Sequence, residues 1–244
     1  MKYSKAVYTG LLLIIGFSLV SCEKKTTESM DDITVTDIDG NVYQTIQIGD
    51  QLWMSENLKI THYRNGDSII NAPYDGLWEG LETGQYCIYN SDSLNVDIYG
   101  NLYNWYAVND PRGLAPDGWH IPTDAEILEL EMYLGMHESI AYSTGWRGIN
   151  EGSKLAGGLD LWLDGDLTDS TDFGISGFDF LPGGYREAIS GGYSYLQPLG
   201  RFWSSTSTGN GDYAWGREIE SFRKNIRRDS FNYHYGYSVR CVKD

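Results

Sequence analysis

The chain has 244 residues and is rich in aromatic residues and glycine, with 19 Tyr, 8 Trp and 29 Gly. This composition favours short strands and tight turns over long helices, because glycine destabilises helices and aromatic residues favour strands. The formal net charge of −16 argues against nucleic acid as a partner, since phosphates require a basic surface.

Residues 1–21 have the pattern of a bacterial lipoprotein signal peptide. Lys2 and Lys5 make the start basic, and residues 6–20 form an apolar run. The run ends in LVSC, where small residues before Cys22 resemble a lipobox. In that motif the cysteine is acylated and becomes the first residue of the mature chain. We therefore expect lipidation at Cys22.

The predicted domain organisation follows from this leader. Residues 22–32 would be the acylated cysteine and a polar tether, and residues 33–244 would form one folded domain. A lipid on Cys22 would hold the protein at a membrane without embedding it. An ordinary secreted protein and an uncleaved anchor are the alternatives.

A β-hairpin is predicted near the start of the domain. Asp39 and Gly40 separate two apolar runs, and this pair favours the positive-φ positions of a tight turn. The second run alternates with a period of two, which predicts a half-buried strand. One face would carry Val42, Ile46 and Ile48, and the other Tyr43, Thr45 and Gln47.

Residues 111–135 predict a loop that leads into one amphipathic helix. Thr123 is the expected N-cap, and Glu126 three residues later completes a capping box. Gly135 fits the position just after a helix, where a left-handed residue ends it. Apolar residues at spacings of three and four, Ile127, Leu130 and Leu134, would form the buried face.

The competing hypothesis for this segment is an active-site loop. His120 would act as a base, with Asp117 or Asp124 as its partner. Because starting and ending one helix accounts for every unusual feature of the segment, we expect the loop to be architectural.

Cys87 and Cys241 both lie in strand-like runs. A chain exported beyond the membrane meets an oxidising environment, so a disulfide between them is predicted. The alternative is two buried free thiols, since free cysteine is common in protein cores.

An aspartate-rich segment extends over residues 160–179. Oxygen ligands on a turn are what Ca²⁺ prefers, so this segment is a candidate calcium site. A solvated acidic loop is the alternative. The candidate ligands are Asp160, Asp164, Asp166, Asp169 and Asp172.

The C-terminal third of the chain offers candidate ligand contacts. Aromatic rings can stack on sugars, although most rings in such a chain must form the core. The basic run RKNIRR, residues 223–228, is either a solvated face or a contact for anionic groups. The candidates are Trp203, Trp215, Tyr235, Arg223 and Arg227, with Tyr213, Tyr233 and Tyr237 as further aromatic residues.

Seven motifs occur in order: IGDQLWMSENL, YGNLYNWYAVN, PDGWHIPTDAE, SKLAG, SGFDFLPGGYR, FWSSTS and GYSVRCVKD. Their order over residues 34–244 resembles the Fibrobacter succinogenes major paralogous domain, a family of surface and secreted lipoproteins of Fibrobacteres and Bacteroidetes. The resemblance implies a lipoprotein anchored in the outer membrane of a Gram-negative bacterium.

Several of these motifs are also similar to segments of C-type-lectin-like and formylglycine-generating-enzyme-like domains. That similarity implies an α+β fold with twisted antiparallel strands, one or two short helices and long irregular loops. A formylglycine-generating enzyme requires a redox-active cysteine pair, whereas Cys241 has only the distant Cys87 as a possible partner. The chain therefore departs from that chemistry.

These features together predict a non-catalytic, surface-tethered module that recognises glycan or protein ligands. No catalytic motif is recognisable, and no cofactor is expected other than the possible Ca²⁺. A polysaccharide-active enzyme on the same scaffold and a structural component of a surface assembly are the alternatives.

Overall fold

The computed structural model describes Met1, Tyr3 and residues 34–74, 78 and 80–244. Apart from Met1 and Tyr3, the predicted signal peptide, Cys22 and the tether lie outside the described residues. Within the described part of the chain, no helix combines the length and the apolar character needed to cross a membrane.

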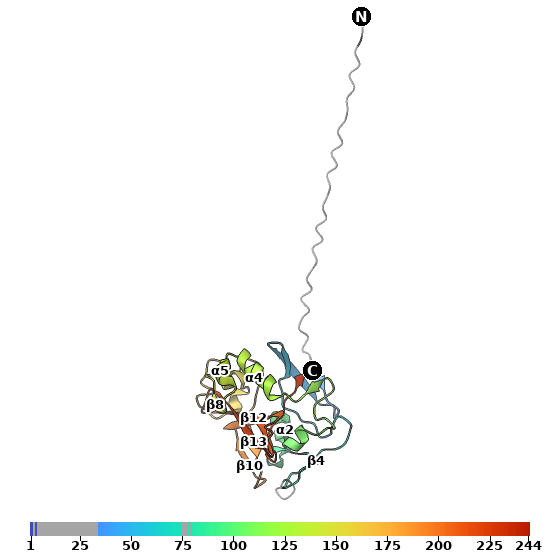
Figure 1. Ribbon diagram of the computed structural model, residues 1–244, viewed down its shortest axis with the longest axis vertical. Helices are drawn as coiled ribbons and strands as arrows, with labels where there is room; N and C mark the ends of the chain where they lie inside the picture. The colour runs from blue at the N-terminus through green and yellow to red at the C-terminus, as the bar shows by residue number, and fades with distance from the viewer. Residues whose placement is uncertain (2, 4–33, 75–77, 79) are drawn as a thin grey trace. The chain divides into compact units, whose positions relative to one another are not determined.

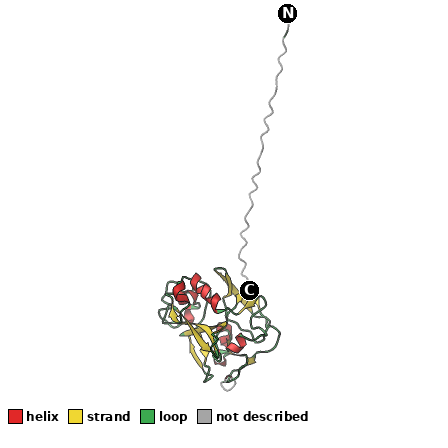
Figure 2. Cartoon of the chain, in the orientation of Figure 1, coloured by secondary structure: helices red, strands yellow, loops and turns green. Residues whose placement is uncertain are grey.

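Antiparallel strands make up most of the regular secondary structure, and short helices and long loops connect them (Figures 1 and 2). A five-stranded sheet has the order β1 (Thr34–Thr36), β2 (Val42–Ile48), β3 (Gln51–Met54), β14 (Val242–Lys243), β7 (Trp119–His120). A six-stranded sheet has the order β10 (Tyr193–Leu196), β9 (Gly183–Arg186), β11 (Leu199–Ser207), β12 (Tyr213–Glu220), β13 (Ile226–Asn232), β8 (Gly145–Arg147). A three-stranded sheet has the order β4 (Ile70–Asn71), β5 (Gln85–Cys87), β6 (Leu102–Tyr103). Only β4 with β5 and β9 with β11 pair in parallel among the described strands, so the prediction of a mixed fold with mainly antiparallel sheets is confirmed.

The described residues form five short α-helices, where one or two had been expected. Small polar residues start several of them: Asp92 accepts from the backbone of α2, and Asn104 accepts from the backbone of α3. Such caps accept hydrogen bonds from amide groups that have no partner within the helix. They therefore stabilise the short helices between the strands. The helices are α2 (Ser93–Tyr99), α3 (Trp105–Val108), α4 (Asp124–Tyr133), α5 (Glu138–Ala141) and α6 (Glu151–Leu155), and the 3₁₀ turns are η1 (Tyr89–Ser91) and η2 (Leu159–Leu161).

Helix α4 begins as the sequence predicts. The Thr123 hydroxyl accepts a hydrogen bond from the Glu126 amide at 3.2 Å, and the Glu126 carboxylate accepts one from the Thr123 amide at 2.7 Å. This reciprocal pair is the predicted capping box.

The other end of α4 also confirms the prediction. Gly135 has a φ of 113°, and its amide donates to the carbonyl of Met132, while the amide of Met136 donates to that of Glu131. These two bonds form a Schellman motif. The predicted apolar residues Ile127 and Leu130 are buried, and Leu134 packs against the same part of the core.

The two predicted faces of β2 do not separate into one buried and one exposed side. Tyr43 is fully buried and Val42 is 53% exposed, whereas Ile48 is buried as expected. The Tyr43 hydroxyl donates to the Asp37 carboxylate at 2.6 Å. Asp37 also orders the β1–β2 turn by accepting from the amides of Asp39 and Asn41, so one carboxylate secures both the turn and the buried ring.

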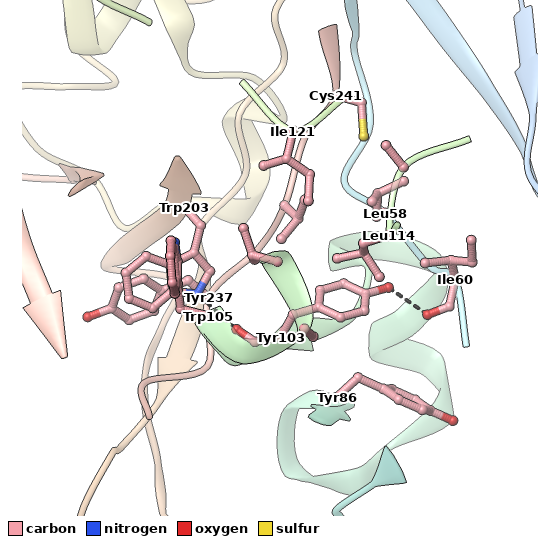
Figure 3. Packing of buried hydrophobic residues seen from close by; sticks show 14 of the residues in the cluster. Leu58, Ile60, Tyr86, Tyr103, Trp105, Leu114, Ile121, Trp203, Tyr237 and Cys241 are labelled. Carbon is pink, nitrogen blue, oxygen red and sulfur yellow. Dashed lines mark hydrogen bonds between the residues drawn. The ribbon is translucent and has the colours of Figure 1, made fainter. Parts of the chain in front are cut away.

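Aromatic side chains fill much of the core (Figure 3). The Trp203 indole donates to the Tyr103 carbonyl at 2.9 Å, and the Tyr103 hydroxyl donates to the Ile60 carbonyl at 2.7 Å. The ring centroids of Trp203 and Tyr237 are 4.4 Å apart. Because the indole of Trp203 and the hydroxyl of Tyr103 both have partners, these two large side chains bury apolar area while their polar atoms stay hydrogen-bonded.

The last strand joins segments that are far apart in the sequence. Val242 of β14 pairs with Trp53 of β3 on one side and with His120 of β7 on the other. The described residues from Thr34 to Asp244 belong to one compact unit.

Candidate functional site

A groove of about 700 Å³ lies where the β12–β13 hairpin meets the turn between β9 and β10. Tyr213, at the start of β12, pairs with Asn232, at the end of β13, so the two strand ends meet here. The strands β10, β12 and β13 belong to the same six-stranded sheet (Figure 1). The lining residues, which define the groove below, are Gly80, Ala188, Ile189, Tyr213, Arg227, Ser230, Phe231, Asn232, His234 and Tyr235.

Arg201 and Tyr185 hold two of the lining aromatic residues in place. The Arg201 guanidinium lies 4.0 Å from the ring centroid of Tyr185 and 5.0 Å from that of Phe231. Tyr185 in turn meets Tyr235 edge to face, with centroids 5.8 Å apart. Arg201 itself is bonded to the Glu218 carboxylate, so a partly buried cation with its own counter-charge supports the aromatic side of the groove.

Arg227 supplies the cationic side chain of the groove, and internal carboxylates occupy its guanidinium. Its Nε and Nη2 donate to Asp229 Oδ2 at 3.1 and 2.7 Å, and its Nη1 lies 3.5 Å from Glu218 Oε1. Burial alone would lower the pKa of Arg227, but the bonds to Asp229 and the charge of Glu218 raise it above its ordinary value. Arg227 is therefore a fixed, already paired cation.

The polar lining residues retain hydrogen-bonding capacity. Asn232 Oδ1 accepts from the His234 amide and lies 3.0 Å from His234 Nδ1, which fixes the loop after β13. Trp78 secures the same loop by donating from its indole to the His234 carbonyl at 2.6 Å. Within the described residues, Ser230 Oγ, Asn232 Nδ2 and His234 Nε2 have no hydrogen-bond partner. These three groups can bond to water or to a ligand.

The apolar rim of the groove is exposed. Tyr213 is 44% exposed, and Ile189, in the turn after β9, is 86% exposed. No aspartate or glutamate is among the described residues that line the groove. The groove thus offers flat apolar surface and neutral polar groups.

Two of the five predicted ligand contacts, Arg227 and Tyr235, line this groove. The prediction for Trp203 is wrong, because that side chain is fully buried and its indole is already bonded in the core. Trp215 packs under the Arg228 guanidinium at 3.6 Å. Trp215 is three positions before Glu218, the partner of Arg201, so its side chain lies on the other face of β12, and it does not line the groove.

Arg223 and Arg228 show that the basic run is not one surface. Arg223 is paired with Glu220 at 2.6 Å and lies over the Trp146 ring. Arg228 is buried and bonded to Asp124 at 2.6 Å, which corrects the expectation that the run is a solvated face or an anion contact. Long-range pairing decides which arginine is buried.

Sequence reasoning missed Ile189, Ser230, Asn232 and His234. The alternation of aromatic and polar residues in FNYHYGY, residues 231–237, could have indicated Asn232 and His234. The sequence carries no comparable signal for Ile189, because its role depends on where the β9–β10 turn folds.

The aspartate-rich segment provides no geometric support for the calcium hypothesis. Among the described residues, no three acidic, histidine or cysteine side chains come together in an arrangement that could hold a metal ion. Asp172 instead bonds to Asn150. The candidate ligands Asp160, Asp164, Asp166 and Asp169 are therefore not gathered into one site.

His120 bridges two carboxylates. Its Nε2 lies 2.7 Å from Glu126 Oε1, and its Nδ1 lies 2.7 Å from Asp244 Oδ1. Neither partner proposed for an active-site loop accompanies it, because Asp117 pairs with Arg64 and Asp124 is buried among arginines. With both ring nitrogens engaged, His120 connects α4 to the chain end, as an architectural role requires.

The two cysteines correct the disulfide prediction. Both are free, buried thiols in this structure. Cys87 belongs to a small core beside Trp78 and Tyr89, whereas Cys241 belongs to the main aromatic core. Burial raises the pKa of Cys87 to about 11 and also raises the pKa of Cys241. Since the thiolate is the reactive form, burial favours the unreactive thiol at both positions.

Comparison with known proteins identifies a family that matches this chain. The profile of the Fibrobacter succinogenes major domain matches residues 46–243, a range that contains β3, α4 and every lining residue of the groove. Comparisons with curated proteins and with solved structures find no match. Because the profile spans well over half of the chain, the protein belongs to the Fibrobacter succinogenes major domain family.

Proposed function

We propose that this protein is a non-catalytic recognition module that binds glycan in the groove and is held at the outer membrane by a lipid on Cys22. The observation that carries the proposal is a groove in which exposed aromatic and aliphatic side chains lie beside unpaired neutral polar groups.

The chemistry of the lining fits a sugar ring. A pyranose presents an apolar C–H face and a rim of hydroxyl groups, so it needs a flat ring such as Tyr213 and neighbouring donors and acceptors such as Asn232 and His234. The groove volume of about 700 Å³ lies within the range of roughly 300–1,000 Å³ that is usual for ligand pockets.

The lining argues for binding rather than hydrolysis. A glycosidase ordinarily needs two facing carboxylates, one as acid and one as base or nucleophile. The described lining contains none, and the nearby Glu218 and Asp229 are both bonded to arginines. A polysaccharide-active enzyme would require a different surface of the chain.

We further propose the C-type-lectin-like variant of the mixed fold. Two features support it: β14 pairs with β3, near the start of the domain, and long irregular segments connect short elements. The first feature is the close approach of chain ends that the resemblance implies. An experimental structure with a different strand order would overturn this assignment.

The anchor has its own test. Replacing Cys22 by Ala should move the protein from the membrane fraction to the soluble fraction, because the acyl chains would be lost. A Cys22→Ala protein that is still processed and still membrane-bound would refute lipidation at this residue.

The groove is tested by removing one exposed ring. Tyr213→Ala should weaken binding to a polysaccharide identified on a glycan array roughly threefold to tenfold, the equivalent of about 0.5–1.5 kcal/mol for one stacked ring. Tyr142→Ala is the matched control, since Tyr142 is also exposed but does not line the groove. Equal affinity of the two variants, or turnover of the polysaccharide by the wild-type protein, would contradict the proposal.

A further inference from the structure

The charges around the groove restrict which glycan can occupy it. Arg201 and Arg227 are the guanidiniums at the aromatic side, and each is bonded to a carboxylate of Glu218 or Asp229. These four groups neutralise one another. Proteins commonly bind the carboxylate of an acidic sugar through an unpaired arginine. Among the described residues on this side of the groove, no arginine is left unpaired.

Two further acids lie next to lining residues. Asp212 precedes Tyr213, and its backbone carbonyl accepts from the Tyr233 amide at 2.8 Å. Glu187 precedes Ala188, and its charge acts on the neighbouring Tyr185. These carboxylates leave the surroundings of the groove negative, and the chain as a whole carries −16. A polyanion approaching this surface is repelled.

A cationic ligand is disfavoured for a different reason. A carboxylate facing the ligand is the strongest partner for a cation, and no acidic residue is among the described lining residues. Glu218 and Asp229 are already paired with arginines. The binding groups that face a ligand are therefore apolar surface and neutral donors and acceptors.

We infer that the occupant of the groove is a neutral glycan, a chain of uncharged pyranose units, and that Glu187 and Asp212 exclude polyuronates. This inference rests on the proposed function and specifies its ligand class. Affinity then comes from stacking and neutral hydrogen bonds, so it depends little on ionic strength, in contrast to the binding of a charged ligand.

The test uses the full chain, purified in a polyoxyethylene detergent because sugar-based detergents would compete for the groove. The probes are mixed-linkage glucan, xyloglucan and galactomannan as neutral polysaccharides, and polygalacturonate as the anionic one. We expect binding to at least one neutral probe, with a Kd that changes less than about twofold with salt, and at least about tenfold weaker binding of polygalacturonate.

The double variant Glu187→Gln with Asp212→Asn tests whether these two carboxylates exclude polyuronates. It should gain about tenfold in polygalacturonate binding at low salt and leave neutral binding unchanged, because it removes two repelling charges and no lining residue. The matched control is Asp97→Asn with Glu138→Gln, two exposed acids on α2 and α5. The control should change neither affinity.

The outcomes separate this inference from the proposed function. Stronger binding of polygalacturonate than of every neutral probe by the wild-type protein would overturn the inference and leave glycan recognition standing. Neutral binding with no gain in the double variant would overturn the role of Glu187 and Asp212. No binding to any of the four probes would overturn both.

Discussion

At the scale of single residues, His120 shows how a catalytic-looking side chain serves as a connector. Its imidazole lies between Glu126 of α4 and Asp244, and it belongs to β7, which pairs with β14. Burial alone would lower the pKa of His120, but the hydrogen bonds and charges of Asp244 and Glu126 raise it above the ordinary 6.5. The protonated form is thus favoured in the folded state.

This shift predicts a pH dependence of stability. A histidine whose pKa is raised by folding contributes stability that is fully present below its unfolded pKa and is lost as the pH rises through its folded pKa. The stability advantage of the wild-type protein over His120→Gln should therefore shrink as the pH rises above 6.5. Urea unfolding midpoints of both proteins at several pH values measure this difference.

The Asp244→Asn variant controls for the source of the effect, since it removes one of the two carboxylates and should reduce the difference. Parallel pH profiles for wild type and His120→Gln would refute the bridge. Because His120 does not line the groove, His120→Gln should bind polysaccharide as the wild type does.

At the scale of elements, α4 depends on its cap. Thr123→Ala removes the side-chain oxygen that accepts from the Glu126 amide, so it should lower the free energy of unfolding by about 1 kcal/mol. Chemical denaturation measures the loss. Thr144→Ala, at an exposed loop position, is the matched control and should stay within about 0.5 kcal/mol of wild type. A loss no larger than that of the control would mean that packing alone defines the start of α4.

At the scale of the whole molecule, buried ion pairs attach α4 to the six-stranded sheet. Arg217 of β12 donates to Glu131 at 2.7 Å and to Asp124 at 2.8 Å, and all three side chains are buried. Arg147 of β8 and Arg228 of β13 complete the network. Its members come from four elements in two distant parts of the sequence, α4 and β8 in one part and β12 and β13 in the other.

Arg217→Met should therefore lower the free energy of unfolding by about 1.5–3 kcal/mol, because two buried carboxylates lose its hydrogen bonds and keep only Arg147 and Arg228 as partners. Arg223→Met is the matched control: its salt bridge to Glu220 is half exposed, so it should cost less than about 1 kcal/mol. Equilibrium unfolding in urea compares the two. A small loss in Arg217→Met would show that apolar packing, and not this network, holds α4 on the sheet.

The sequence by itself determined the features that depend on neighbouring residues. The capping box at Thr123, the glycine end of α4 and its buried face follow from spacings of one to four residues, and such spacings are visible without the fold. The ordered motifs likewise indicated the family, which the profile match confirms.

Only the tertiary structure decided which members of a residue type are buried and which are paired. Trp203 lies in the core while Tyr213 is exposed at the groove, and Arg228 is buried while Arg223 is not. Cys87 and Cys241 occupy separate parts of the core and form no disulfide. The physical reason is that burial and charge pairing depend on contacts between segments about a hundred residues apart, as in Arg228 with Asp124. The spacing of neighbouring residues in the sequence does not reveal those contacts.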